Sequence, residues 1–367
     1  MEPAHVNVSA AVTRDADSPP AIEDLELAAP RDDEVVVRLV ATGVCHTDLF
    51  APRICPLPAV FGHEGAGIVE RVGARVGKVR PGDRVAMTFG SCGHCRHCAG
   101  GLSAYCEHGH HLQFGGTRAD GGTTLARDGE PVHGSFFQQS SFATRALATE
   151  RNVVPLPDDL PLELAAPLGC GVQTGAGTIL RSLRAPAGSS VAVFGAGTVG
   201  LAAIMAARWA RLDPIIAIDI SSARLGLALE LGATHALDAR EGDIVARIQA
   251  IARGGVMYSM ETSAALPALN DAIGCLARRG ECALVTVPAL GAPVPFSLLP
   301  LLTGGRRLIA VLEGDSEPDT FIPQLAAMHR AGDLPVERLV ADYGFADIGR
   351  ALAAAAAGSV VKPVLRF

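Results

Sequence analysis

The chain has few of the residues that mark several common protein classes. Only two of its 31 basic residues are lysines, Lys78 and Lys362, tryptophan occurs once, and aromatic residues make up 4% of the 367 residues. The formal net charge is -7 and no basic stripe is present, which argues against nucleic acid as a partner. No apolar run reaches the about 18–20 residues that cross a bilayer, so we expect no membrane partner.

The first residues of the chain also lack the features of an export signal, because no basic segment is followed there by an apolar one. The nine cysteines are an odd number, which disfavours a disulfide framework. Both observations predict a cytoplasmic protein. The length suggests two domains of about 150–200 residues each.

What the chain does have is a dense group of thiols. They are Cys92, Cys95, Cys98 and Cys106. Such close spacing lets tight turns bring four sulfurs around one tetrahedral Zn²⁺, with Zn–S bonds of about 2.3 Å. A disulfide loop and a two-pair zinc ribbon are the alternatives, but a ribbon needs two separated pairs. Four thiols leave no position for a substrate, so we expect a structural zinc, with His94 and His97 as solvated loop residues.

The pattern of apolar residues changes along the chain. Up to about residue 160 it is β-rich, with short strands predicted at 35–40, 66–72 and 85–87. Further on, predicted strands alternate with predicted helices: strands at 190–194, 214–218 and 282–287, and helices at 198–212 and 224–231. This alternation predicts an α/β fold with a doubly wound parallel sheet of Rossmann type. The last residues, 362–367, are predicted to form an edge strand.

A glycine-rich turn follows the strand at 190–194 directly. Gly195, Gly197 and Gly200 form a GxGxxG string at the start of the next helix, where they permit a tight turn, close approach of a pyrophosphate and close helix–strand packing. The free N–H groups of the helix start then bind phosphates. Asp219 ends the next strand, where its carboxylate can accept the ribose hydroxyls of NAD and repel the 2′-phosphate of NADP. The alternative is that Asp219 only caps the following turn.

Three further candidate metal ligands, Cys45, His63 and Cys170, are far apart in sequence. A Cys₂His set that leaves a fourth position open is a catalytic zinc arrangement, and zinc lowers the pKa of a hydroxyl so that an alcohol can lose hydride. Three neighbouring residues are candidates to support this chemistry: Thr47 as acceptor of the substrate proton, Asp48 as the group that orients His63, and Glu64 behind the metal. Taken alone, Cys170 could be an ordinary buried residue.

The order and spacing of these motifs over nearly the whole chain resemble those of the zinc-dependent medium-chain alcohol dehydrogenases. The resemblance implies a GroES-like catalytic domain at 1–171, a Rossmann NAD-binding domain at 172–310, and a return segment of the catalytic domain at 311–367. It implies two zinc ions per chain, NAD, and a homodimer or homotetramer. It also implies further contacts to the cofactor: His46 and Lys362 at the pyrophosphate, Thr174 and Val199 at the nicotinamide, and Arg224 at the adenosine ribose.

Several segments resemble more narrowly the aryl-alcohol (benzyl-alcohol) dehydrogenase branch, among them residues 45–48, 134–143, 169–177 and 313–316. This resemblance implies a primary benzylic alcohol or its aldehyde as the small-molecule substrate, with Phe50, Phe136 and Phe137 at the pocket. Phe50 stands where many relatives carry a histidine that relays protons, and the segment between Cys45 and His63 is shorter than usual.

Other functions remain open from the sequence. The substrate could be a terpenoid allylic alcohol, an aliphatic alcohol or a glutathione adduct of formaldehyde. A non-catalytic NAD-binding scaffold or sensor and a metal-free quinone reductase are more distant alternatives, because neither needs the full set of Cys45, His63, Cys170 and Thr47.

Overall fold

The computed structural model describes residues 5–286, 291 and 293–367. They divide into two compact units. Unit 1 comprises Met1–Cys170, Glu317–Arg330 and Val336–Phe367, and unit 2 comprises Gly171–Ser316 and Ala331–Pro335. Along the chain, unit 2 begins at Gly171, its first segment ends at Ser316, and residues 331–335 also belong to it. The domain boundaries that the resemblance implies, 171/172 and 310/311, remain predictions.

Unit 1 contains two sheets. The five-stranded sheet has the order β4-β1-β2-β7-β8 and the seven-stranded sheet the order β10-β6-β5-β3-β18-β17, with β9 paired to β3. The strands of the first are β1 (His5–Thr13), β2 (Ala21–Ala28), β4 (Ala59–Val60), β7 (Leu125–Arg127) and β8 (Glu130–Val132). Those of the second are β3 (Glu34–Gly43), β5 (Glu64–Val72), β6 (Arg84–Met87), β9 (Arg145–Thr149), β10 (Val153–Pro155), β17 (Val340–Gly344) and β18 (Lys362–Arg366).

The helices of unit 1 are mostly short and flank these sheets. They are α1 (His46–Phe50), α2 (Arg96–Ala99), α3 (Gly109–Phe114), α4 (Leu162–Ala165), α11 (Pro318–Arg330) and α12 (Ile348–Ala357). The alanine-rich α12 packs on β18 and ends at Gly358, whose φ of 64° lies in the left-handed region that glycine adopts easily. Its buried side chains, Ile348, Ala351 and Ala355, belong to a hydrophobic cluster that includes residues of both sheets, such as Val8 of β1 and Leu365 of β18.

The predicted edge position of the final strand is wrong. β18 lies inside its sheet, antiparallel to β3 through Val364–Arg366 and parallel to β17 on its other side. The strand next to it at the edge is β17, which the sequence analysis did not identify. Because β18 is interior, its Val364 and Leu365 are fully buried. The C-terminal residues therefore tie the return segment to β3, the strand that leads to Cys45.

Unit 2 is built on a six-stranded parallel sheet of order β13-β12-β11-β14-β15-β16. Counted from β11, this is the 3-2-1-4-5-6 order of the doubly wound dinucleotide-binding fold. The strands are β11 (Val191–Phe194), β12 (Ile215–Asp219), β13 (His235–Asp238), β14 (Val256–Glu261), β15 (Leu276–Leu284) and β16 (Arg307–Ala310). The predicted strand at 282–287 is therefore misplaced: it begins at Leu276 and ends at Leu284, and Val287 lies outside the described residues.

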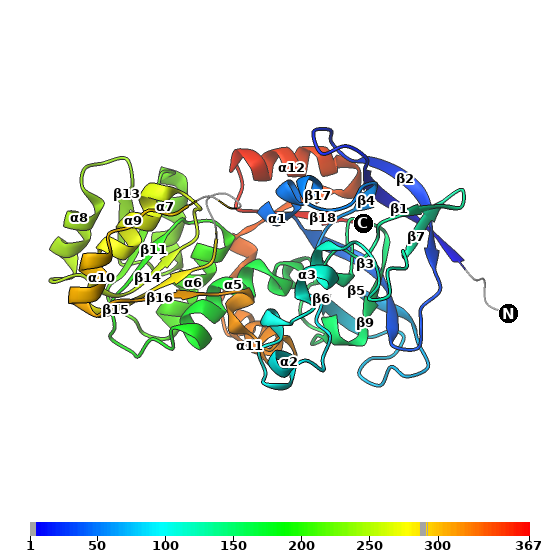
Figure 1. Ribbon diagram of the computed structural model, residues 1–367, viewed down its shortest axis with the longest axis horizontal. Helices are drawn as coiled ribbons and strands as arrows, with labels where there is room; N and C mark the ends of the chain where they lie inside the picture. The colour runs from blue at the N-terminus through cyan, green and yellow to red at the C-terminus, as the bar shows by residue number, and fades with distance from the viewer. Residues whose placement is uncertain (1–4, 287–290, 292) are drawn as a thin grey trace. The chain divides into compact units, whose positions relative to one another are not determined.

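Helices surround the unit 2 sheet (Figure 1). They are α5 (Gly171–Gly177), α6 (Thr198–Trp209), α7 (Ser222–Leu231), α8 (Ile244–Ile251), α9 (Leu266–Gly274) and α10 (Leu298–Gly304). Phe194 and Ile218 pack with α8 and α9 on one face, while the alternate residues Val191 and Val193 are buried on the other. Burial on both faces explains why β11 and β12 are almost wholly apolar. Among the described residues, no helix is long and apolar enough to cross a membrane.

Candidate functional site

The three predicted catalytic metal ligands lie together in unit 1. One possible ligand atom from each of Cys45, His63, Glu64 and Cys170 lies within 4.8 Å of the others. Cys45 immediately precedes α1, His63 precedes β5, and Cys170 ends the unit 1 segment before α5. Elements far apart in sequence therefore bring two sulfurs, an imidazole and a carboxylate to one place.

The imidazole of His63 is oriented by Asp48. Its Nδ1 lies 2.8 Å from Oδ1 of Asp48, whose two oxygens also accept hydrogen bonds from the backbone N–H groups of Gly62 and Cys45. Within the described part of the chain, the buried Nε2 of His63 has no hydrogen-bond partner. A histidine that donates its Nδ1 hydrogen to a carboxylate keeps the lone pair on Nε2, so this atom fits a metal ligand.

The electrostatics of the cluster also suit a cation. The Cys170 thiol, with the positive charges of His63 and Lys362, holds the pKa of Cys45 well below its usual range despite desolvation. Burial disfavours an imidazolium, but Asp48 and Cys45 outweigh it and raise the pKa of His63. The surroundings of His63 thus favour a positive charge beside the two sulfurs. A Zn²⁺ ion fits this place, where it would replace the proton on the imidazole.

Glu64 and Lys362 form a buried ion pair beside this cluster. The Lys362 ammonium lies 2.8 Å from both Glu64 oxygens and donates to the carbonyl of Val44 at 3.0 Å. Burial opposes the charge of Lys362, but the Glu64 carboxylate outweighs it and raises the pKa of the lysine. The sequence analysis expected Lys362 at a pyrophosphate, whereas the partners found for it here are groups of unit 1. Its contact to the cofactor remains a prediction.

The other predicted residues near Cys45 differ in exposure. Oγ1 of Thr47 lies 3.8 Å from Sγ of Cys45, which places the hydroxyl next to the cluster. Asp48 is buried, whereas His46 and Phe50 are exposed. Phe50 has no group that could relay a proton, and its place at the substrate pocket remains a prediction.

Phe136 and Phe137 pack directly on the His63 ring. Phe137 is stacked on it with ring centroids 4.5 Å apart, and Phe136 meets it edge-on at 5.6 Å. The φ of Phe137 is 52°, in the left-handed region that a bulky residue enters at a cost of about 1–3 kcal/mol. Backbone strain of this kind is concentrated at functional sites. Both rings are almost fully buried, so they also fill the core.

Gln139, which the sequence analysis did not select, holds the backbone around His63. Its fully buried amide accepts a hydrogen bond from the N–H of Gly65 and donates to the carbonyls of His63 and Thr88. Nothing in the sequence distinguishes it from the adjacent Gln138, because these contacts come from distant strands. Gln139 is therefore a positioning residue for the metal ligand.

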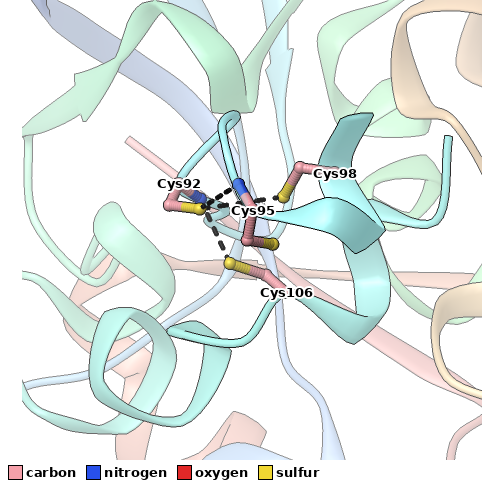
Figure 2. A group of neighbouring side chains, drawn as sticks. All are labelled: Cys92, Cys95, Cys98 and Cys106. Atoms are coloured by element: carbon pink, nitrogen blue, oxygen red, sulfur yellow. Dashed lines mark hydrogen bonds between the residues drawn. The ribbon is translucent and has the colours of Figure 1, made fainter. Parts of the chain in front are cut away.

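A second cluster in unit 1, shown in Figure 2, is formed by the four thiols predicted to bind a structural zinc. They are Cys92, Cys95, Cys98 and Cys106. Their ligand atoms lie within 4.8 Å of one another, and Sγ of Cys92 is 4.0 Å from Sγ of Cys98. This is close to the about 3.8 Å that follows for two thiolates on a tetrahedral zinc with 2.3 Å bonds. All nine cysteines are described and free. The alternative of a disulfide loop therefore does not hold.

Backbone N–H groups and burial act in opposite directions on these thiols. N–H groups of Cys98 and Glu107 lower the pKa of Cys95 to about 6, whereas burial raises that of Cys106 to about 12. A bound divalent metal deprotonates such thiols outright. The donor set thus fits a closed structural zinc site, with no position for a substrate.

The glycine-rich turn of unit 2 has the geometry expected of a phosphate-binding loop. Gly195 has a φ of 94°, and a Cβ atom on Gly200 would overlap the carbonyl oxygen of Gly195, so neither position tolerates a side chain. A Cβ on Gly197 would instead meet nothing within 4 Å. The space in front of Gly197, at the start of α6, is where the backbone can approach a pyrophosphate.

Asp219 occupies the end of β12 and contacts this turn. Its Oδ2 accepts from the N–H of Ala196 at 2.6 Å, and its Oδ1 accepts from the N–H of Ser221 at 2.8 Å. Asp219 therefore does cap the following turn, the alternative considered above. Each carboxylate oxygen has a further lone pair, so the same side chain can also accept ribose hydroxyls.

Helix α5 carries Thr174 and lies against the first turn of α6. A Cβ on Gly175 would overlap the carbonyl oxygen of Val199, which explains why glycine stands there. Glu313, which the sequence analysis noted only as part of a segment, holds this helix: its Oε2 lies 3.3 Å from Nε2 of Gln173 and 3.4 Å from Oγ1 of Thr174. Arg224 lies in the first turn of α7, whose N-cap is Ser221.

Two family models match the chain, and both agree with the sites described above. Residues 31–158 match the alcohol dehydrogenase GroES-like domain, and residues 198–329 match the zinc-binding dehydrogenase domain. A geraniol dehydrogenase of Castellaniella defragrans is 46% identical over 99% of this chain and 98% of its own length.

Two solved structures are also similar to this chain over nearly its whole length. An alcohol dehydrogenase zinc-binding domain protein of Burkholderia ambifaria is 50% identical, with a TM-score of 0.97 over 99% of both chains. The benzyl alcohol dehydrogenase of Acinetobacter calcoaceticus is 39% identical, with a TM-score of 0.95 over 99% of both chains. Together with the Cys₂His cluster and the dinucleotide-binding turn, these likenesses show that the chain belongs to the zinc- and NAD-dependent medium-chain alcohol dehydrogenases.

Proposed function

We propose that the enzyme reversibly oxidises a primary alcohol whose carbinol carbon adjoins a π-system, benzylic or allylic, to its aldehyde, with NAD as hydride acceptor. The observation that carries this proposal is the His63 imidazole. It lies beside the Cys45 and Cys170 thiols, has no hydrogen-bond partner at Nε2 among the described residues and is covered by the stacked ring of Phe137. Relatives named for benzyl alcohol and for geraniol support the substrate class, because both compounds carry such a π-system.

Each residue of the cluster has a definable task in this reaction. Cys45, His63 and Cys170 would hold a zinc ion, which would supply the Lewis acidity that makes an alcohol hydroxyl acidic near neutral pH. Thr47 would accept the hydroxyl proton. From Thr47 the proton would leave through water or a ribose hydroxyl of the cofactor, because Phe50 has no group to relay it. Loss of hydride leaves positive character at the carbinol carbon, which an attached π-system stabilises.

A substrate panel tests this class. We expect kcat/KM for benzyl alcohol to exceed that for ethanol by up to about tenfold, because ring contacts add about 0.5–1.5 kcal/mol beyond burial. For geraniol we expect a value above that for ethanol, because its double bond stabilises the positive character at the carbinol carbon. Phe137→Ala should lower kcat/KM for the two conjugated alcohols more than for ethanol. The exposed Phe367 provides a matched control, and Phe367→Ala should leave the ratios unchanged. NADH absorbance is the measurement.

The panel also separates the two branches. A large advantage for benzyl alcohol over geraniol supports the aryl-alcohol assignment made from the sequence, whereas the reverse order assigns the enzyme to terpenoid alcohols. Equal kcat/KM for ethanol and the conjugated alcohols would refute the proposal.

We also propose that the enzyme strongly prefers NAD to NADP, because the Asp219 carboxylate would repel a 2′-phosphate. Asp219→Ser should weaken NAD binding and bring kcat/KM for NADP closer to that for NAD. The Kd of each reduced cofactor, measured by fluorescence titration, separates binding from catalysis. Comparable Kd values of NADH and NADPH for the wild-type enzyme would contradict this preference.

The predicted homodimer or homotetramer and the predicted cytoplasmic location remain proposals. Unit 2 supports a dimer, since β16 ends its sheet and the nearby helix α10 leaves Leu298, Leu299 and Leu302 about two-thirds or more exposed. An apolar surface beside an open sheet edge is suited to a second copy. A monomeric mass by light scattering would exclude a dimer.

The cytoplasmic location is supported by the free cysteines, which suit a reducing compartment.

A further inference from the structure

Histidines are concentrated around the structural zinc cluster. Five of the eleven histidines of the chain lie within residues 94–111, namely His94, His97, His108, His110 and His111. This is the segment that also supplies three of the four structural thiols. These imidazoles take no part in the proposed alcohol oxidation or in the four-thiol cluster. Their concentration in this segment therefore points to a separate role.

Two of these histidines are placed to bind a metal. Ligand atoms of His94, His108 and Cys92 lie within 4.8 Å of one another, and the two rings, both exposed, have centroids 5.8 Å apart. Nδ1 of His94 lies 2.9 Å from the carbonyl oxygen of Cys92, which can only accept a hydrogen bond. A neutral His94 that donates from Nδ1 to this carbonyl has its lone pair on Nε2, the atom that would bind a metal.

The surroundings do not oppose a cation. A cavity of about 560 Å³ is lined by His94, His108 and Cys92. Three arginines and three carboxylates also line it, so the fixed charges of the cavity wall cancel. Four thiolates around one Zn²⁺ carry a formal charge of −2, which attracts a further cation beside Cys92. Imidazole and thiolate ligands favour zinc, cobalt, nickel and copper over magnesium and calcium.

We propose that His94 and His108, beside the Cys92 sulfur, form an accessory site for one exchangeable divalent transition-metal ion such as Zn²⁺. This site is additional to the four-thiol cluster and to the cluster of Cys45, His63 and Cys170. Its ligands are two exposed imidazoles, with water and the outer face of the Cys92 sulfur completing the shell. Since the site is open to solvent, the ion binds and leaves reversibly.

Cobalt titration of the zinc-loaded holoenzyme tests the proposal. After loosely held metal is removed on a chelating resin, Co²⁺ is added and followed by calorimetry and visible absorption. We expect one additional Co²⁺ per chain with no loss of zinc by elemental analysis. His94→Gln and His108→Ala should each weaken this binding at least tenfold. His110→Ala removes an exposed imidazole of the same segment outside the group and should leave the affinity unchanged.

Alcohol oxidation without added metal should be the same in the wild type and all three variants, because none of these histidines is in the catalytic cluster. The proposal is wrong if no additional Co²⁺ binds, or if Co²⁺ enters only by displacing zinc. It is also wrong if the double variant His94→Gln/His108→Ala binds Co²⁺ as tightly as the wild type, or if His110→Ala weakens binding as much as the other two substitutions.

Discussion

Cys170→Ser is expected to lose about one zinc ion per chain and to lower kcat/KM for alcohol oxidation by about 1000-fold or more, since the metal contributes several kcal/mol of transition-state stabilisation. A serine hydroxyl is a weak zinc ligand because it stays protonated at neutral pH, whereas the thiolate is a strong one. The four-thiol cluster is formed by other residues, so the melting temperature should change little. Elemental analysis, NADH absorbance and calorimetry measure the three effects.

Two matched cysteine substitutions make this prediction specific. Cys98→Ser removes a ligand of the other cluster and should lower the melting temperature or the yield of folded protein, because that site closes its own loop. Cys55→Ser changes a half-buried thiol outside both clusters and should retain zinc and activity. Wild-type protein that binds only one zinc, or full activity in Cys170→Ser, would contradict the assignment of two separate sites.

The grouping of the candidate metal ligands could be predicted from sequence because the chemistry of such ligands limits the choices. Four closely spaced thiols have few alternatives to one zinc site. The dinucleotide turn was predictable for a similar reason: Gly195 and Gly200 occupy positions where the backbone excludes any side chain. Gly195 directly follows a strand, and Gly200 lies in the first turn of the helix that comes next. In both cases the residues that carry the pattern lie close together in the chain, and the bound ion or phosphate limits which residue types can stand there.

Long-range pairing was not predictable in this way. The sequence of β18 has the composition of many edge strands, and only its parallel pairing with β17 shows that it is interior. The contacts of Gln139 and Glu313 likewise join segments separated by up to about 140 residues. The same limit applies to Lys362, whose carboxylate partner Glu64 is 298 positions away.

The ion pair of Glu64 and Lys362 predicts a large effect on stability. Lys362→Met keeps the length of the side chain but removes the ammonium from a carboxylate that is fully buried. Removing one partner of a buried pair costs about 3–5 kcal/mol in the free energy of unfolding. The pKa of Lys362 in the folded protein lies above the ordinary value of 10.5. The contribution of this lysine is therefore fully present below pH 10.5 and is lost as the pH rises through the higher folded-state pKa.

The double variant Lys362→Met/Glu64→Gln separates this charge effect from a loss of packing. A neutral amide needs no cation, so the double variant should regain part of the stability that Lys362→Met loses, as a partner-dependent effect does in a double-mutant cycle. Lys78→Met removes the only other lysine, whose side chain is partly exposed and paired with Asp319, and should cost about 1 kcal/mol or less. Urea unfolding at pH 7 measures all three. Equal losses for Lys362→Met and Lys78→Met would show that the buried pair contributes no more to stability than one at the surface.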